Sequence, residues 1–132
     1  NITVVKEICT KGNLQEYEDE VSNIVNNIEN HGFGVAPRYD INKSSIAWDQ
    51  KIIRPSLKEA SKGIAIIWDL LHEYGHAIDG EPKEPSDERE IKAWDYAREM
   101  LSKYPKLHER IESFESRRVI CLKTYGINEQ NK

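Results

Sequence analysis

Hydrophobic residues recur at helical spacing in several parts of the chain. The first such stretch predicts a helix over about residues 13–30, with Asn13 as its N-cap and Glu16 as the partner in a capping box. Its apolar face comprises Leu14, Tyr17, Val21, Ile24, Val25 and Ile28. The sequence His-Gly-Phe-Gly at residues 31–34 ends this helix, because glycine favours the left-handed conformation that follows a helix end.

The next segment predicts extended structure. Two pieces rich in β-forming residues, 35–41 and 45–54, are separated by the polar turn at residues 42–44. Pro55 ends the second piece, because proline cannot donate to a strand ladder.

The rest of the sequence predicts three more helices. Ser56 and Glu59 form a capping-box pattern, so the first of these helices is expected to begin there and to run to Ile78. The second is expected to begin at Ser86 or Asp87, after a short loop, and to run to Ser102, and the third is expected over residues 105–125. All 132 residues are expected to form one α+β domain, with a small sheet and a mostly helical C-terminal half.

The helix that ends at Ile78 contains a polar motif in an apolar run. The sequence "HEYGH" places His72 and His76 four residues apart, with Glu73 after the first histidine. Positions i and i+4 share one face of a helix, so both imidazoles can bind one Zn²⁺ ion. Glu73 is placed to accept a proton from water bound to that ion, as in metalloproteases. Because buried polar groups without partners are costly, the motif predicts a zinc site.

Zinc in a hydrolase usually has three protein ligands and one water. No histidine follows His76 at a suitable spacing, so a carboxylate of the next helix is expected, from Asp87, Glu88 or Glu90. We expect Glu90 to be the ligand. The alternative is that Glu90 serves only as the capping-box partner of Asp87.

The faces of this next helix distinguish the candidates. Glu90 shares its face with a stripe of mostly small residues, Ala93, Ala97 and Leu101. Such a stripe allows another helix to pack closely, and Gly75 within the motif likewise removes a side chain from the contact. Glu88 shares its face with Lys92 and Asp95, which is typical of a solvated surface.

"HEYGHA", followed by E-x-x-A at residues 90–93, resembles the gluzincin metallopeptidases. It is similar to the anthrax lethal factor-like peptidases and to ImmA/IrrE-type domains, over residues 64–101. The resemblance implies a zincin-like fold, with the active-site helix packed against a short sheet. It also implies one Zn²⁺ per chain held by His72, His76 and Glu90, with Glu73 as the catalytic base.

The activity implied is zinc-dependent hydrolysis of peptide bonds in a protein or peptide substrate. One alternative is a zinc-binding regulatory or interaction module without peptidase activity, and another is a metal-free helical domain. Two positions depart from the family pattern: Trp94 stands where an acidic residue or Asn is common, and Lys83 stands where lethal factor-like peptidases carry a tyrosine. That tyrosine is expected to donate a hydrogen bond to the oxyanion that forms during hydrolysis. In its place, Tyr96, Tyr104 and His108 are candidates by residue type.

Two roles stay open at this point. Asp79 either holds a ligand histidine through its second nitrogen or only ends the helix. The segment Ser45–Ile53 either pairs with an extended substrate, as edge strands of zincins do, or is a plain structural strand.

Composition narrows the partners. A net charge of −4, a pI near 5.6 and no basic stripe make nucleic acid and membranes unexpected. No signal peptide or membrane-spanning run is expected. The compartment, secreted or cytoplasmic, and the oligomeric state stay open. Cys9 and Cys121 are expected to be free thiols, with a single bridge as the alternative.

Overall fold

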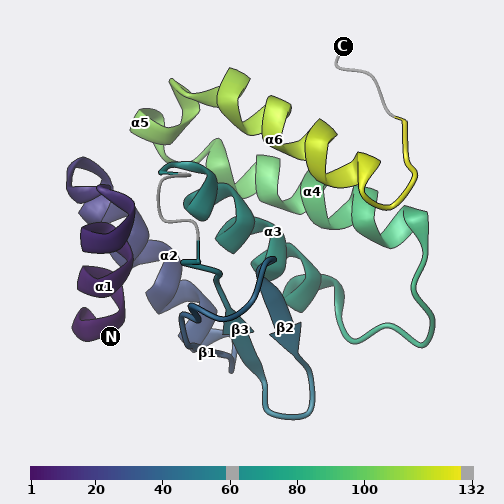
Figure 1. Cartoon of the computed structure of the whole chain (residues 1–132), viewed down its shortest axis with the longest axis horizontal. Helices are drawn as coiled ribbons and strands as arrows, with labels where there is room; N and C mark the ends of the chain where they lie inside the picture. The colour runs from purple at the N-terminus through teal and green to yellow at the C-terminus, as the bar shows by residue number, and fades with distance from the viewer. Residues whose placement is uncertain (59–62, 129–132) are drawn as a thin grey trace.

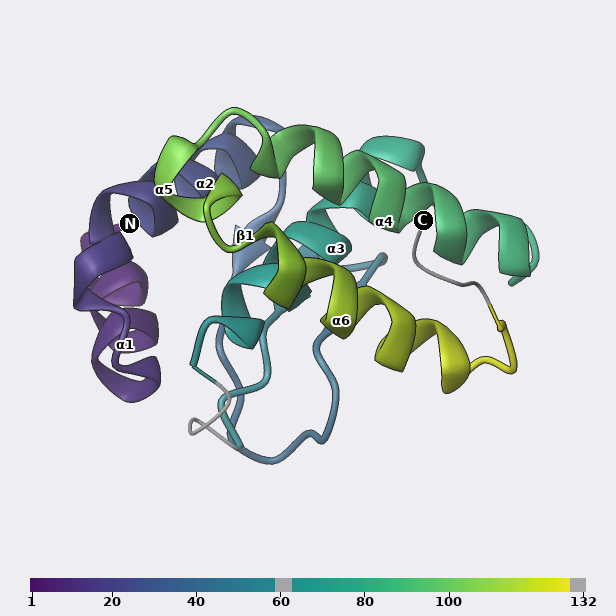
Figure 2. The ribbon, with the colours of Figure 1, turned by 90° about the horizontal axis from the view of Figure 1, so that it is seen from above.

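The helix that carries the two histidines, α3 (Ala65–Asp79), lies at the centre of the molecule (Figure 1). The computed structural model describes residues 1–58 and 63–128 and has the expected α+β fold. Eleven of the 15 residues of α3 are buried, because other elements pack on several sides of it. Helices α4 (Asp87–Leu101) and α6 (Ile111–Lys123) lie along one side of α3 and a small sheet on another (Figures 1 and 2).

The N-terminal part folds as two helices, where the sequence predicted one. Helix α1 (Ile2–Gly12) is followed by a short 3-10 turn, η1 (Gln15–Tyr17), and by α2 (Glu18–Asn30). The prediction that Asn13 begins a helix is wrong. Asn13 has φ 53° and ends α1, since asparagine tolerates the left-handed conformation. The predicted apolar face is confirmed, with all six of its residues buried.

Three short strands form a mixed sheet: β1 (Gly34–Val35), β2 (Ser45–Ala47) and β3 (Ile52–Arg54). The strand order is β1-β3-β2, with β1 parallel and β2 antiparallel to β3. The second predicted strand is therefore a hairpin, because Lys51 adopts φ 53° in the turn that reverses the chain. Most of the first predicted strand lies outside the sheet. Strand β2 is at an edge and contacts α3.

The predicted start of α3 is wrong, and its predicted end is confirmed. The helix begins at Ala65, because Gly63 adopts φ 56° and interrupts the chain before it. The Ser56 hydroxyl donates to the Ile41 carbonyl at 2.6 Å and accepts from the Lys58 backbone N–H at 3.4 Å. Glu59, the expected capping partner, lies outside the described residues. Gly80, with φ 97°, follows the last turn.

Helix α4 occupies almost the whole predicted range. Ser86 is its N-cap, and the Ser86 side chain accepts a hydrogen bond from the Arg89 backbone N–H at 3.3 Å. The helix predicted over residues 105–125 divides into α5 (Pro105–His108) and α6, because the chain leaves helical geometry at Arg110.

Buried apolar side chains from every one of these helices form a common core cluster. Trp68 and Trp94 are fully buried in it, and Trp48 packs against its edge. Cys9 and Cys121 are free thiols, and burial raises the pKa of each to about 11, which keeps them protonated and unreactive at neutral pH. No helix within residues 1–58 and 63–128 combines the length and apolar character needed to cross a bilayer.

Candidate metal centre

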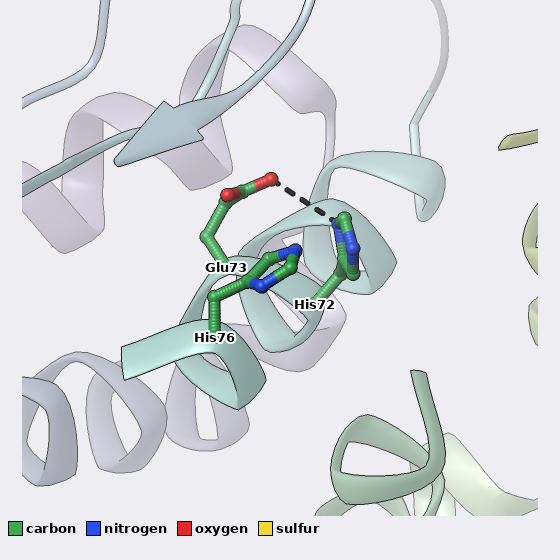
Figure 3. Close-up of side chains that lie close together, drawn as sticks. All are labelled: His72, Glu73 and His76. Carbon is green, nitrogen blue, oxygen red and sulfur yellow. Dashed lines mark ion pairs between the residues drawn. The ribbon is translucent and has the colours of Figure 1, made fainter. Parts of the chain in front are cut away.

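The three residues of the motif project from the same side of α3 (Figure 3). One possible ligand atom from each of His72, Glu73 and His76 lies within 4.8 Å of the others. The two imidazole rings have centroids 4.7 Å apart, as expected for side chains one helical turn apart. All three residues are nearly buried, with exposed fractions of 7%, 7% and 9%.

Glu90 reaches the same point from α4. Its two carboxylate oxygens lie 3.2 Å from His72 Nε2 and 3.1 Å from His76 Nε2. A tetrahedral zinc ion with bonds of about 2.0–2.1 Å separates its ligand atoms by about 3.3 Å, close to the distance between each histidine nitrogen and the Glu90 oxygen next to it. The structure thus brings together the four residues that the sequence singled out.

A close backbone contact allows Glu90 to reach the histidines. A Cβ atom added at Gly75 would lie 2.3 Å from the Ala93 carbonyl oxygen, so only glycine fits between the two helices there. Ala93, Ala97 and Leu101 are fully buried, as their predicted packing stripe requires.

The other two carboxylates proposed for this site lie elsewhere. Asp87 and Glu88 are exposed, and Lys92 and Asp95 on the face of Glu88 are exposed as well. The cap of α4 is Ser86, so the alternative in which Glu90 only supports a cap at Asp87 does not describe this helix.

The electrostatics of the cluster favour an ionised, hydrogen-bonded group. Burial lowers the pKa of His72, but the Glu73 and Glu90 carboxylates outweigh it and raise that pKa to about 9. Burial raises the pKa of Glu90, and hydrogen bonds from His72 and His76 outweigh it, lowering that pKa to about 2. A metal ion that binds here must displace the proton on His72.

His72 is in contact with Trp94, the residue that departs from the pattern of the families that the motif resembles. Its ring stacks on that of Trp94, with centroids 4.3 Å apart and planes 8° from parallel.

Asp79 does not hold a histidine. Its carboxylate forms ion pairs with Arg89 at 2.9 Å and Lys92 at 3.2 Å, and thus ties the end of α3 to α4.

Two hollows flank the cluster. The first, here called the ligand hollow, holds about 250 Å³ and is bounded by the motif, Glu90, strand β2 and the loop before α4. The second, the side hollow, holds about 240 Å³ and lies between α3, α6 and residues 42–44. Ser44, His72, Glu73 and Tyr125 line both, so the two hollows meet at the motif.

Tyr125 is the residue at this site that the sequence did not single out. Its backbone is fixed after α6 by a Schellman-type turn, in which Gly126 N–H donates to the Lys123 carbonyl at 2.9 Å and Ile127 N–H to that of Leu122 at 3.0 Å. Gly126 adopts φ 77°. Only its place just before a predicted helix stop could have drawn attention to Tyr125.

Burial raises the pKa of Tyr125 to about 12, with contributions from the Glu90 and Glu73 carboxylates. The phenol therefore keeps its proton at neutral pH and can donate a hydrogen bond. The candidates chosen by residue type do not line either hollow. Tyr104 donates instead to Asn23 Oδ1 at 2.5 Å, and His108 is exposed on α5.

Comparisons with protein-family models, curated proteins and solved structures find no match for this chain.

Proposed function

We propose that this protein is a zinc-dependent peptidase that hydrolyses peptide bonds of a protein or peptide substrate. The observation that carries the proposal is the convergence of His72, His76 and Glu90 at ligand spacing, with Glu73 beside them on the same side of α3. When bound there, Zn²⁺ supplies a Lewis acid and lowers the pKa of water to about 7.

The residues of the chain have separate tasks in this reaction. The Glu73 carboxylate accepts the proton of the attacking water and passes it to the leaving amine. The Tyr125 phenol donates a hydrogen bond to the oxygen of the substrate carbonyl as negative charge develops there. Its position at the meeting of both hollows and its retained proton support this role.

Strand β2 is the proposed docking edge for the substrate backbone. Of the segment Ser45–Ile53, only the β2 part lies at a sheet edge, because β3 is the central strand. Ser45 and Ile46 line the ligand hollow. An extended peptide added to this edge would pass beside Glu73 through main-chain hydrogen bonds, largely independent of sequence.

Zinc content and cleavage test the proposal together. Elemental analysis of the purified protein is expected to give about one zinc per chain, and almost none for His76→Ala and Glu90→Gln. His108→Ala and Glu88→Gln are the matched controls, because both residues are exposed outside the cluster, and both should keep the metal. Absence of zinc from the parent after reconstitution would refute the proposal.

Glu73→Gln separates a peptidase from a zinc-binding module. The variant should keep zinc and lose cleavage of a proteome-derived peptide library, measured by mass spectrometry of the products. A parent protein that binds zinc but cuts no peptide of that library would favour the regulatory or interaction module.

A further inference from the structure

The side hollow has one wall from each of two helices. Asp69, His72 and Glu73 of α3 form the first wall. The second wall comprises Arg117, Ile120 and Cys121 of α6 and Thr124, which caps its C-terminus. These four follow the spacing i, i+3, i+4 and i+7 and so occupy one helix face, different from the buried face that carries Phe114 and Leu122. The hollow is therefore a feature of how α6 packs beside α3.

Apolar surface is exposed at the mouth of this hollow. Within residues 1–58 and 63–128, the exposed large hydrophobic residues are Ile2, Tyr39, Ile120 and Tyr125. Two of them, Ile120 with an exposed fraction of 57% and Tyr125 with 51%, line the side hollow. Apolar side chains gathered around a concavity are typical of a binding site.

Most of the charged side chains that line the side hollow are in contact with other groups of the protein. Arg117 makes a two-pronged contact with Asp69, with Nε–Oδ1 at 2.9 Å and Nη2–Oδ2 at 2.8 Å. The Lys43 ammonium lies 5.4 Å from the centroid of the Tyr125 ring, within cation–π range. The Arg117 and Asp69 charges are thus paired with each other, and the side chains of Ile120, Cys121 and Tyr125 offer carbon surface to an entering apolar group.

We propose that the side hollow binds a bulky apolar side chain of the substrate, next to the bond that is cut. This inference rests on the proposed peptidase function. The hollow shares His72 and Glu73 with the metal centre, so a side chain placed in it belongs to a residue at the reacting bond. Its volume of about 240 Å³ is several times the roughly 30 Å³ of a water molecule and admits one large side chain.

Acyl hydroxamates test this inference without any cleavage, because the hydroxamate binds zinc and the tail explores the hollow. Isothermal titration calorimetry on the zinc-loaded protein would compare acetohydroxamate, 3-phenylpropanohydroxamate and succinate monohydroxamate. The phenyl compound is expected to bind about 30-fold more tightly than acetohydroxamate, from the apolar area that it buries. The succinate compound should gain little.

Two variants assign any gain to the hollow. Ile120→Glu should reduce the advantage of the phenyl compound to less than about 5-fold, while the affinity for acetohydroxamate stays unchanged. Ile2→Glu is the matched control, another exposed isoleucine, on α1 and outside the hollow, and should keep the full advantage. Because Ile120 is exposed, its replacement is not expected to unfold the protein, which circular dichroism would verify.

The outcomes are distinct. Equal affinities for all three compounds, tightest binding of the succinate compound, or an advantage that survives Ile120→Glu would each overturn the inference while leaving the metal centre intact. Failure of acetohydroxamate itself to bind, or of the protein to load zinc, would instead overturn the proposed function, and the inference with it.

Discussion

Among single residues, His72 has an unusual support. A metal-binding histidine is usually oriented by a hydrogen bond from its other ring nitrogen to a carboxylate or carbonyl. Here His72 Nδ1 lies 3.2 Å from Glu73 Oε2, and the flat face of the ring rests on Trp94. Trp94 is a departure from the pattern of the families that the motif resembles, and its indole takes a supporting role through shape rather than hydrogen bonding.

Tyr125→Phe tests the role of the phenol. Removing one oxyanion donor typically lowers kcat by about 10²- to 10³-fold, and that loss is expected here with KM and zinc content nearly unchanged. Steady-state kinetics on a peptide that the parent cleaves would measure it. Tyr39→Phe is the control, because Tyr39 is also exposed but lines neither hollow. Parent-like kcat in Tyr125→Phe would remove the phenol from the mechanism.

The sequence predicted which residues lie together in the candidate metal centre, for two reasons. The spacing of His72 and His76 is local and needs only a helix, and Glu90 stands on a small-residue stripe that indicates close packing. Tyr125 could not be found in this way. Its place at the motif depends on how α6 packs beside α3, which no spacing within α6 reveals.

At the scale of elements, the contact between α3 and α4 depends on one glycine. Gly75→Ala is expected to destabilise the protein by about 1–3 kcal/mol, because the added methyl group overlaps the Ala93 backbone. Urea denaturation would measure the change, and zinc affinity should fall as α4 is pushed away.

Gly34→Ala is the matched control, since its nearest neighbour to an added Cβ lies 3.9 Å away. It should change the free energy of unfolding by much less. A Gly75→Ala variant as stable as the parent would mean that the two helices do not approach as closely as described.

A second link between elements joins α4 to α6. Glu115 accepts hydrogen bonds from Arg98 at 2.7 and 2.9 Å and from Arg118 at 2.8 Å. The hydrogen bond from Arg98 is the main cause that lowers the pKa of Glu115. This stabilisation is therefore present above the unfolded pKa of about 4.5 and is lost as the pH falls through the lower folded value.

Glu115→Gln should accordingly destabilise the protein by about 2 kcal/mol at pH 7, and by progressively less below pH ~4. Thermal melts of both proteins across this range would show the narrowing difference. Glu112→Gln, at an exposed position of the same helix, should show no such convergence. A constant difference at all pH values would mean that the carboxylate charge is not what stabilises this link.

Helix boundaries were predictable where the residue at the boundary favours only one end of a helix. Helix α4 begins where the sequence placed its start, at Ser86 or Asp87, and Ser86 is its N-cap, because serine before an acidic first turn is an N-terminal signal. Asn13 misled, because asparagine serves at either end of a helix. Helix α1 was not predicted, although Val5, Ile8, Cys9 and Gly12 are buried at helical spacing. This apolar pattern is shorter than the one that follows it at residues 13–30, and only the longer one was recognised.

For the whole molecule, a bound metal ion should act as a stabilising ligand. The three proposed ligands, from two helices, lie together only in the folded chain, so zinc at a thousand times its Kd would stabilise that state by about 4 kcal/mol. The Tm should therefore rise with added zinc and fall with a chelator. His76→Ala should show neither response, and a parent Tm insensitive to both would identify a metal-free domain.

The stack of Trp94 on His72 also has an optical consequence. An indole stacked on an imidazole loses part of its emission by electron transfer to that ring, most readily when the ring is protonated, so its emission depends on whether the imidazole is protonated, neutral or bound to an ion. The protein thus carries its own fluorophore against a ligand of the candidate metal centre. If zinc binds as proposed, its binding and release should change the tryptophan emission, which stopped-flow fluorescence would record on the unlabelled protein.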